Sequence, residues 1–334
     1  MRSQRINRPL LPCQRFHHTA AVLAIIACII AVAELHAAPP KLPTLHELTN
    51  QTLGGNQFWA DEHFFHQWRI QRNVFDDHCR LLDEKNVRYA SGTFAECLAR
   101  LEEIKRERRL PPMRGEAVIV MHGLFRTRSS MDKLCTHLRQ QGGYTVLNVG
   151  YPSTRRDVAA HARALAKIVD GLNGIDRVSF VAHSMGNIVI RHYLGDRKAA
   201  GDGKGPRLTR FVMLAPPNQG SLTALALAEN NVLKVVTGDA VRQLGLDWDK
   251  LKDKLAVPAF EFAIIAGGKG DAAGYNPLLP GDDDGTVSVA NTRLAGARDA
   301  AVVPVLHSFI MNDAKVQQHT LRFLKTGRFA VGRD

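Results

Sequence analysis

A serine stands where an apolar stretch changes into a helical pattern. The apolar stretch ends at Ala182, and the helical pattern begins directly after Ser184. A sharp strand-to-helix turn would lift the serine hydroxyl clear of a sheet. It would also place the next backbone N–H, that of Met185, at a helix N-terminus, where partial positive charge favours an oxyanion. Ala182 and Gly186 are small, as close contact between the two backbones requires. The pattern predicts a nucleophile, and the alternative is a buried serine that only caps a helix.

A second junction lies upstream. The run Glu116–Met121 is short and rich in β-branched residues, which is typical of a central parallel strand covered on both faces. It ends in His122-Gly123, and the glycine allows a sharp turn, so that a loop N–H can face the serine. His122 has the chemistry of a base, but we expect it to brace this loop.

A serine nucleophile needs a general base, and three of the fourteen histidines follow Ser184. His192 falls two turns into the helix after the serine, and His319 lies within the last helical pattern. His307 follows an apolar run and precedes the final helix. It therefore stands at the carboxyl end of a last strand, where a base must stand. We predict His307 as the base, and the alternative is a histidine of a surface loop.

The acid that would orient the base is sought in an aspartate-rich segment before the last strand. Asp284, in the sequence Asp-Gly-Thr-Val, is the first choice, because it lies between two predicted strands that precede His307. Asp282, Asp283 and Asp271 are the runners-up. The alternatives are a solvated acidic turn and a calcium site built from carboxylate oxygens.

These residues together resemble the bacterial lipase and esterase branch of the α/β-hydrolases, including triacylglycerol lipases with an Ala-His-Ser-Met-Gly elbow. The resemblance covers residues 116 to 327 and implies ester hydrolysis by Ser184, Asp284 and His307, with backbone oxyanion donors at Leu124 and Met185. Most relatives have glycine where this elbow begins with alanine, a change that a subset of lipases shares. The segments that carry the resemblance are 120–124, 182–186, 214–221, 284–287 and His307.

The order of the patterns predicts the fold. The 334 residues, 45% of them hydrophobic, suffice for a full α/β core. Strand and helix patterns alternate from residue 116 onward. We expect an α/β-hydrolase fold with a mostly parallel central sheet, helices on both faces, and antiparallel leading strands that extend the sheet at one edge. Strands are expected at 116–121, 144–150, 177–182, 208–214, 260–266 and 301–306, and helices at 130–141, 156–172, 185–196 and 312–325.

The chain divides into three predicted parts. Residues 1–37 are expected to form a signal peptide, and residues 38–115 a lead segment with a strand pair and a helix. Residues 116–334 form the predicted catalytic core, with a candidate lid at 219–258. In the lead segment, Thr93-Phe-Ala-Glu96 is a capping box that opens a helix.

The N-terminus reads as an export signal. Four arginines precede Thr19–Ala33, an apolar run of about fifteen residues, and an alanine-rich zone follows. The run is shorter than the ~20 residues of a spanning helix. We predict cleavage near Ala37 or Ala38 and a periplasmic or secreted protein. The alternatives are an uncleaved membrane anchor and, less in keeping with the apolar residues that continue after it, lipidation at Cys28.

The net charge of the chain limits which classes of partner are expected. The formal net charge of +12 includes a basic cluster at residues 105–109. A solvated helix face explains such a cluster, and weak attraction to an anionic membrane surface is the alternative. No nucleic-acid fold motif is present, so no nucleic-acid partner is expected.

Cys79, Cys97 and Cys135 would remain after export. A Cys79–Cys97 disulfide and buried free thiols are both compatible with the pattern.

The leading hypothesis is an exported serine esterase or lipase that acts on an ester or lipid through an acyl-enzyme, with no metal or organic cofactor. The same triad would also serve an acyltransferase that uses an alcohol acceptor. A third hypothesis is a hydrolase fold without activity that serves as a binding protein. The acyl chain length and the head group of the substrate do not follow from these patterns.

Overall fold

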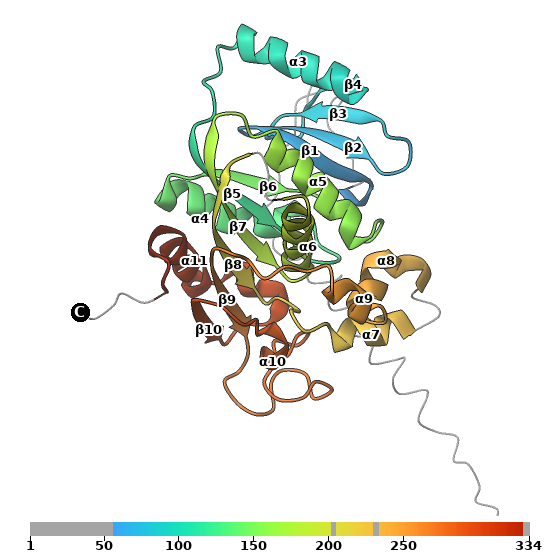
Figure 1. The fold of residues 1–334 in the computed structure, drawn as a ribbon, viewed down its shortest axis with the longest axis vertical. Coiled ribbons are helices and arrows are strands. Elements are labelled where there is room, and N and C mark those ends of the chain that lie inside the picture. The colour runs from blue at the N-terminus through green and yellow to red at the C-terminus, as the bar shows by residue number, and fades with distance from the viewer. Residues whose placement is uncertain (1–55, 202–204, 230–233, 330–334) are drawn as a thin grey trace, which may run out of the picture. The chain divides into compact units, whose positions relative to one another are not determined.

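The structure is a computed structural model that describes residues 56–201, 205–229 and 234–329 (Figure 1). Structural statements concern these residues. The predicted signal peptide and its cleavage site lie outside them. Helices and strands keep the labels of Figure 1.

A six-stranded sheet with every neighbouring pair parallel forms the centre. Consecutive residues in the middle strands are buried, as expected for apolar strands covered on both faces. The chain adds β6 on one side of β5 and β7 on the other, so the loops after β5 and β7 meet at a topological switch point. In sheet order the strands are β10 (Asp299–Val303), β9 (Glu261–Gly267), β8 (Arg207–Leu214), β7 (Ile175–His183), β5 (Gly115–Met121) and β6 (Thr145–Val149).

Helices cover both faces of this sheet, which confirms the predicted arrangement (Figure 1). On one face α4 (Asp132–Gly142) packs against α11 (Ala314–Thr326), and on the other α5 (Val158–Asp170) packs against α6 (Met185–Ala199). Asp313 caps α11 by accepting a hydrogen bond from the N–H of Val316. The short elements near the site are η2 (Arg128–Met131), α10 (Val289–Thr292) and η3 (His307–Asn312).

The lead segment corrects one prediction. Its strands do not extend the parallel sheet but form a separate antiparallel sheet in the order β1-β2-β3-β4. At the outer edge of β6 the carbonyl of Val146 accepts hydrogen bonds from the side chains of Gln67 (3.1 Å) and Arg139 (3.1 Å) and not from a strand. Directly after β6, the N–H of Asp61 in β1 donates to the carbonyl of Gly150 at 2.9 Å, but no ladder continues from this bond. The strands are β1 (Trp59–Phe65), β2 (Trp68–Asn73), β3 (Cys79–Leu82) and β4 (Arg88–Gly92), preceded by η1 (Asn56–Phe58).

The predicted capping box is present in the lead segment. Helix α3 (Phe94–Glu107) begins after Thr93, whose hydroxyl accepts from the N–H of Glu96 while the Glu96 carboxylate accepts from the N–H of Thr93. Two orphan donors of the helix N-terminus are thereby satisfied. Part of the basic cluster is paired on this helix, because Lys105 lies 2.7 Å from the carboxylate of Glu102.

The last strand of the sheet is shorter and begins earlier than expected. It spans Asp299–Val303 instead of 301–306. Pro304 follows it directly and has no N–H to donate to the ladder, so pairing ends there. The displacement leaves residues 304–306 as a connection that leads into His307.

The segment predicted as a lid contains the helices α7 (Leu222–Glu229), α8 (Lys234–Leu244) and α9 (Trp248–Lys252). The hydroxyl of Thr223 donates to the carbonyl of Thr286 at 2.8 Å, and the side chain of Gln243 accepts from the N–H of Val158 at 2.9 Å. These bonds tie the helices to the core. Movement of this segment as a lid stays a prediction.

The three described cysteines are buried free thiols. Burial raises the pKa of Cys97 to about 11 and that of Cys135 to about 12, so neither is a reactive thiolate at neutral pH. Within the described ranges, no helix combines the length and the apolar character needed to span a membrane.

Candidate active site

Ser184 occupies the sharp turn between β7 and α6. Its backbone has φ 52° and ψ −125°, a strained conformation for a residue with a side chain. Two contacts hold it there: the N–H of Ser184 donates to the carbonyl of Leu214 at 2.9 Å, and the amide of Asn187 donates to the carbonyl of Ser184 at 2.9 Å. A Cβ on Gly186 would lie 2.7 Å from the carbonyl oxygen of His122, so only glycine fits.

The structure brings Ser184, His307 and Asp284 into one hydrogen-bonded chain. The Oγ of Ser184 lies 2.9 Å from Nε2 of His307, and Nδ1 of His307 lies 2.7 Å from Oδ2 of Asp284. An ionised carboxylate only accepts, so Nδ1 carries the proton and Nε2 is free to accept from the serine hydroxyl. This is the order of contacts that a nucleophile, a base and an acid require.

Asp284 is fixed by the loop around it. The carboxylate is buried, and its Oδ1 accepts hydrogen bonds from the N–H groups of Thr286 (3.0 Å) and Val287 (2.7 Å). The N–H of His307 in turn donates to the carbonyl of Asp284 at 2.8 Å. One carboxylate oxygen is thus held by the backbone, and the other is aimed at the imidazole.

The loop after β5 lies against the nucleophile. A Cβ on Gly123 would lie 2.9 Å from the Cβ of Ser184, which explains the glycine. Phe125 has a positive φ of 55°, and the N–H of Arg126 closes the turn by donating to the carbonyl of Gly123 at 3.3 Å. Leu124 therefore lies beside Ser184, as Met185 does at the start of α6. Among the described residues, no carbonyl accepts from either N–H.

Comparison with known proteins agrees with this geometry. Residues 116–246 match a protein family described as "Putative serine esterase (DUF676)". The chain has an α/β-hydrolase fold. No curated protein matches it in sequence. Similar solved structures include a gene product from Listeria innocua, with 17% identity and a TM-score of 0.45 over 65% of this chain and 95% of the other. An esterase from Pyrobaculum calidifontis has 15% identity and a TM-score of 0.48 over 97% of this chain and 100% of the other.

The fold is evident from the order of the parallel strands and from the helices on both faces of the sheet. The matched residues 116–246 include Ser184 and the loop after β5.

The other aspartates of the acid segment have different partners. Asp282 accepts from the N–H groups of Lys269 (2.7 Å) and Gly270 (2.9 Å). Asp283 is buried and accepts from Asn276 (3.0 Å) and from the N–H of residue 285 at 2.6 Å. These carboxylates organise the loop and are not merely solvated. Hydrogen bonds from the backbone N–H groups of residues 274 and 273 lower the pKa of Asp271. Within the described ranges, no three acidic, histidine or cysteine side chains gather as metal ligands.

The ring of His122 makes its hydrogen bonds with groups other than Ser184, in agreement with the expectation that it braces the loop. Its Nδ1 donates to the carbonyl of Gly123 at 2.8 Å, and its Nε2 accepts from the N–H of Tyr151 at 3.4 Å. The Tyr151 ring stacks on it with centroids 4.2 Å apart. Burial lowers the pKa of His122 to about 4, so the ring stays neutral and keeps both bonds.

Two residues of the site were not singled out from the sequence. His183 is buried, with its ring centroid 4.6 Å from that of His307. Burial, followed by the charges of His307 and Arg126, holds the pKa of His183 well below its usual range, so it packs behind the base as a neutral ring. Gln57, from η1, donates to the carbonyl of Arg126 at 3.0 Å. His183 stands inside the elbow motif and was therefore visible, whereas nothing in the sequence around Gln57 points to this contact.

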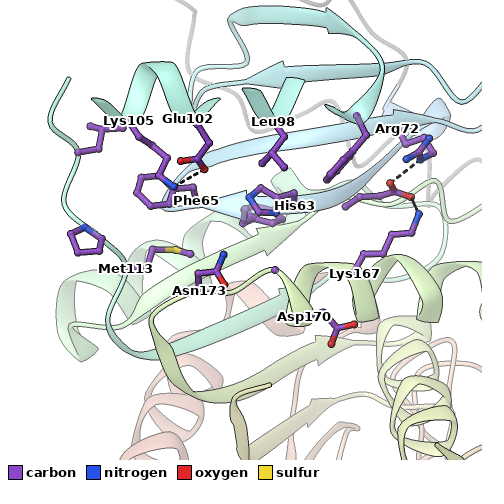
Figure 2. A pocket seen from close by; sticks show the side chains of 16 residues that line it. His63, Phe65, Arg72, Leu98, Glu102, Lys105, Met113, Lys167, Asp170 and Asn173 are labelled. Atoms are coloured by element: carbon purple, nitrogen blue, oxygen red, sulfur yellow. Dashed lines mark hydrogen bonds and ion pairs between the residues drawn. The ribbon is translucent and has the colours of Figure 1, made fainter. Parts of the chain in front are cut away.

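A large cavity lies apart from this site. It measures about 710 Å³ and lies between β1, α3 and the end of α5 (Figure 2). Its lining includes no triad residue, and Glu62 pairs with both Lys167 (2.6 Å) and Arg72 (2.8 Å). The cavity is therefore large, but it does not contain the contact of Ser184, His307 and Asp284.

The acid assignment predicts a graded mutant series. Asp284→Asn should lower ester turnover by up to about 10⁴-fold, because an amide favours the wrong tautomer of His307. Asp282→Asn, at a half-exposed position, should leave turnover within a few-fold. Asp283→Asn should lower the midpoint of thermal unfolding more than turnover, because it weakens buried loop bonds. Purified variants compared by initial rates and thermal melts would show this. If Asp283 or Asp282 proved the position that abolishes turnover, the acid would have to be moved there.

Proposed function

We propose that this α/β-hydrolase is an exported serine carboxylester hydrolase, an esterase or lipase that works through an acyl-enzyme. The observation that carries the proposal is the continuous contact from Ser184 Oγ through His307 to buried Asp284. The family match over residues 116–246 supports the reaction class.

The geometry suits a two-step reaction. In the first step Ser184 Oγ attacks the ester carbonyl while Nε2 of His307 takes its proton. The resulting oxyanion accepts hydrogen bonds from the N–H groups of Leu124 and Met185. His307 then protonates the leaving alcohol, and the acyl group stays on Ser184. In the second step water gives a proton to His307 and attacks the acyl-enzyme, which releases the acid and restores the serine.

Apolar side chains around the triad favour a substrate with an apolar part. Leu306 and Phe309 flank His307 and are 42% and 40% exposed. Side chains of this kind, left in water beside a nucleophile, bind acyl chains by removing apolar surface from solvent.

Two measurements test the function. A fluorophosphonate probe should label Ser184, and labelling should disappear in Ser184→Ala. A panel of chromogenic esters of increasing acyl length should then be hydrolysed, with kcat/KM rising beyond acetate as the chain covers more of the apolar rim. Labelling without hydrolysis of any ester would contradict the esterase assignment, and absence of labelling in folded protein would contradict the nucleophile.

Export makes a separate prediction. The four arginines, the short apolar run and the alanine-rich zone support cleavage near Ala37 or Ala38. Protein recovered from the periplasm or medium of an exporting host should therefore begin near Ala38 when its N-terminus is sequenced. Replacement of Leu23 and Ile25 by arginine should keep the protein in the cytosol with Met1 intact. Membrane-bound protein that retains Met1 would mean an anchor, and cytosolic wild-type protein would contradict export.

A further inference from the structure

Arg126 connects the two loops of the candidate active site. It follows Leu124 by two residues, and its Nη2 donates to the carbonyl of Ser308 at 3.4 Å. Ser308 is the neighbour of His307, so the side chain reaches from the loop after β5 to the loop that carries His307. After burial and the charge of His307, the charge of Arg126 also contributes to the lowered pKa of the buried His183.

This cation has no counter-ion among the described residues. Some half-buried arginines are paired: Arg72 lies 2.8 Å from Glu62, and Arg210 lies 2.9 Å from Glu261. Others lack an ion pair but have closer hydrogen-bond acceptors, as Arg139 does in Gln67 (3.0 Å) and the carbonyl of Val146 (3.1 Å). No described carboxylate lies within ion-pair distance of Arg126, and the bond to Ser308 uses one of its five N–H groups at a long distance. Burial lowers its pKa, which reflects the cost of holding a charge away from water. A cation in this position is favourable when a ligand supplies the negative charge.

The backbone of Arg126 is held in place by the lead segment. The carbonyl of Arg126 accepts from Gln57 Nε2 at 3.0 Å. The Oε1 of the same Gln57 accepts from the N–H (3.3 Å) and the hydroxyl (3.1 Å) of Thr154, in the loop after β6. A binding group that is fixed before the substrate arrives loses little freedom on binding.

We propose that Arg126 binds a carboxylate or phosphate group of the substrate, so that this enzyme prefers esters that carry an anion beside an apolar part. The inference rests on the proposed esterase function. A planar guanidinium matches both anions through two parallel N–H bonds. The apolar rim formed by Leu306 and Phe309 would contact the remainder of the same molecule.

Matched substrates test the preference and locate the anion. On the acyl side, the para-nitrophenyl ester of glutaric acid is compared with the ester of its neutral monoamide. On the alcohol side, the butyryl ester of glycerol phosphate is compared with glycerol monobutyrate. Wild-type enzyme should prefer the anionic member of one pair by about tenfold or more in kcat/KM, the size expected for a charge-assisted hydrogen bond. The pair that shows the preference identifies the side of the ester that bears the charge.

Three variants separate binding from structure. Arg126→Gln should remove the preference while it leaves neutral esters within a few-fold of wild type. Arg126→Lys should keep part of the preference, because an ammonium retains the charge without the fork. Arg163→Gln, at an exposed position on α5, should change nothing. Equal loss for charged and neutral esters in Arg126→Gln would show that the arginine only joins the two loops, and absence of preference in wild type would also overturn the inference.

A binding measurement keeps the inference independent of turnover. In Ser184→Ala, calorimetry with the neutral diamide of glutaric acid, glutarate, glycerol and glycerol phosphate should show tighter binding of an anion than of its neutral counterpart, and Arg126→Gln in the same background should abolish the difference. If no ester is hydrolysed but the anion binds through Arg126, the proposed function fails and the anion site stands. If esters are hydrolysed and neither anion binds in preference to its neutral counterpart, the anion site fails and the esterase stands.

Discussion

Replacing Ser184 with alanine is expected to reduce ester turnover by about 10⁶-fold, the loss seen when a triad nucleophile is removed. The reason is geometric. The hydroxyl that meets Nε2 of His307 at 2.9 Å belongs to Ser184, and without it no acyl-enzyme can form at this position. The oxyanion donors would remain, so a small rate above that of water should persist. The measurement is kcat on a short chromogenic ester, with active sites counted by fluorophosphonate titration.

A second serine, in the strand that precedes Ser184, provides the control. Ser179 is buried in the middle of β7, and its hydroxyl donates to Glu116 at 2.8 Å, away from the turn. Ser179→Ala should cost some stability and keep turnover within a few-fold. A folded Ser184→Ala protein with more than about a tenth of wild-type activity would disprove the elbow assignment, since the residual activity of triad mutants is orders of magnitude lower.

Local sequence rules were sufficient where a residue acts on its near neighbours. The capping box at Thr93 was visible because it depends on contacts within three residues, and the turn at Ser184 was visible because it needs small residues at fixed positions around the serine. The strands of the parallel sheet were visible for a similar reason, since burial on both faces demands continuous apolar runs. Of these, only β10 shifted, and Pro304 accounts for its earlier end.

Contacts between distant segments were not predictable in this way. Whether the lead strands pair with β6 depends on what already occupies the edge of β6, and there the side chains of Gln67 and Arg139 take the carbonyl of Val146. Choice among three consecutive aspartates depends on which carboxylate the loop turns toward His307. Gln57 supports the oxyanion loop through its hydrogen bond to the carbonyl of Arg126, which lies 69 residues later in the sequence. None of these contacts leaves a periodicity or a local motif.

The contact of Ser184, His307 and Asp284 was nevertheless expected from residue types, because acyl transfer demands a short set of groups in a restricted order. The order Ser184, Asp284, His307 along the chain reflects the fold: each stands after a different strand, and parallel strands bring their carboxyl ends to one edge. Gln57, in the lead segment, is not one of these three residues, but it contacts the loop beside Ser184. The lead segment therefore contributes to the geometry of the site as well as to the fold.

Replacing His307 with alanine is expected to cost about as much turnover as losing Ser184, near 10⁶-fold, because base and nucleophile act as a unit. Without the imidazole the serine hydroxyl keeps its proton and the leaving alcohol receives none. Fluorophosphonate labelling should slow in parallel, since the probe reacts with the same activated hydroxyl. Initial rates and labelling rates, measured on protein shown to be folded by its thermal melt, provide the test.

Other histidines distinguish this role from a packing effect. His122→Ala should lower the unfolding midpoint, since it removes the stacked contact with Tyr151, but labelling of Ser184 should persist. His192→Ala, on α6, removes a ring that lies 3.0 Å from Asp196 and should leave turnover nearly unchanged. If folded His122→Ala lost labelling while His307→Ala kept it, His122 would be the base. That outcome would require the ring to leave both of its hydrogen bonds and approach the serine from the other side of Gly123, against the geometry of the loop.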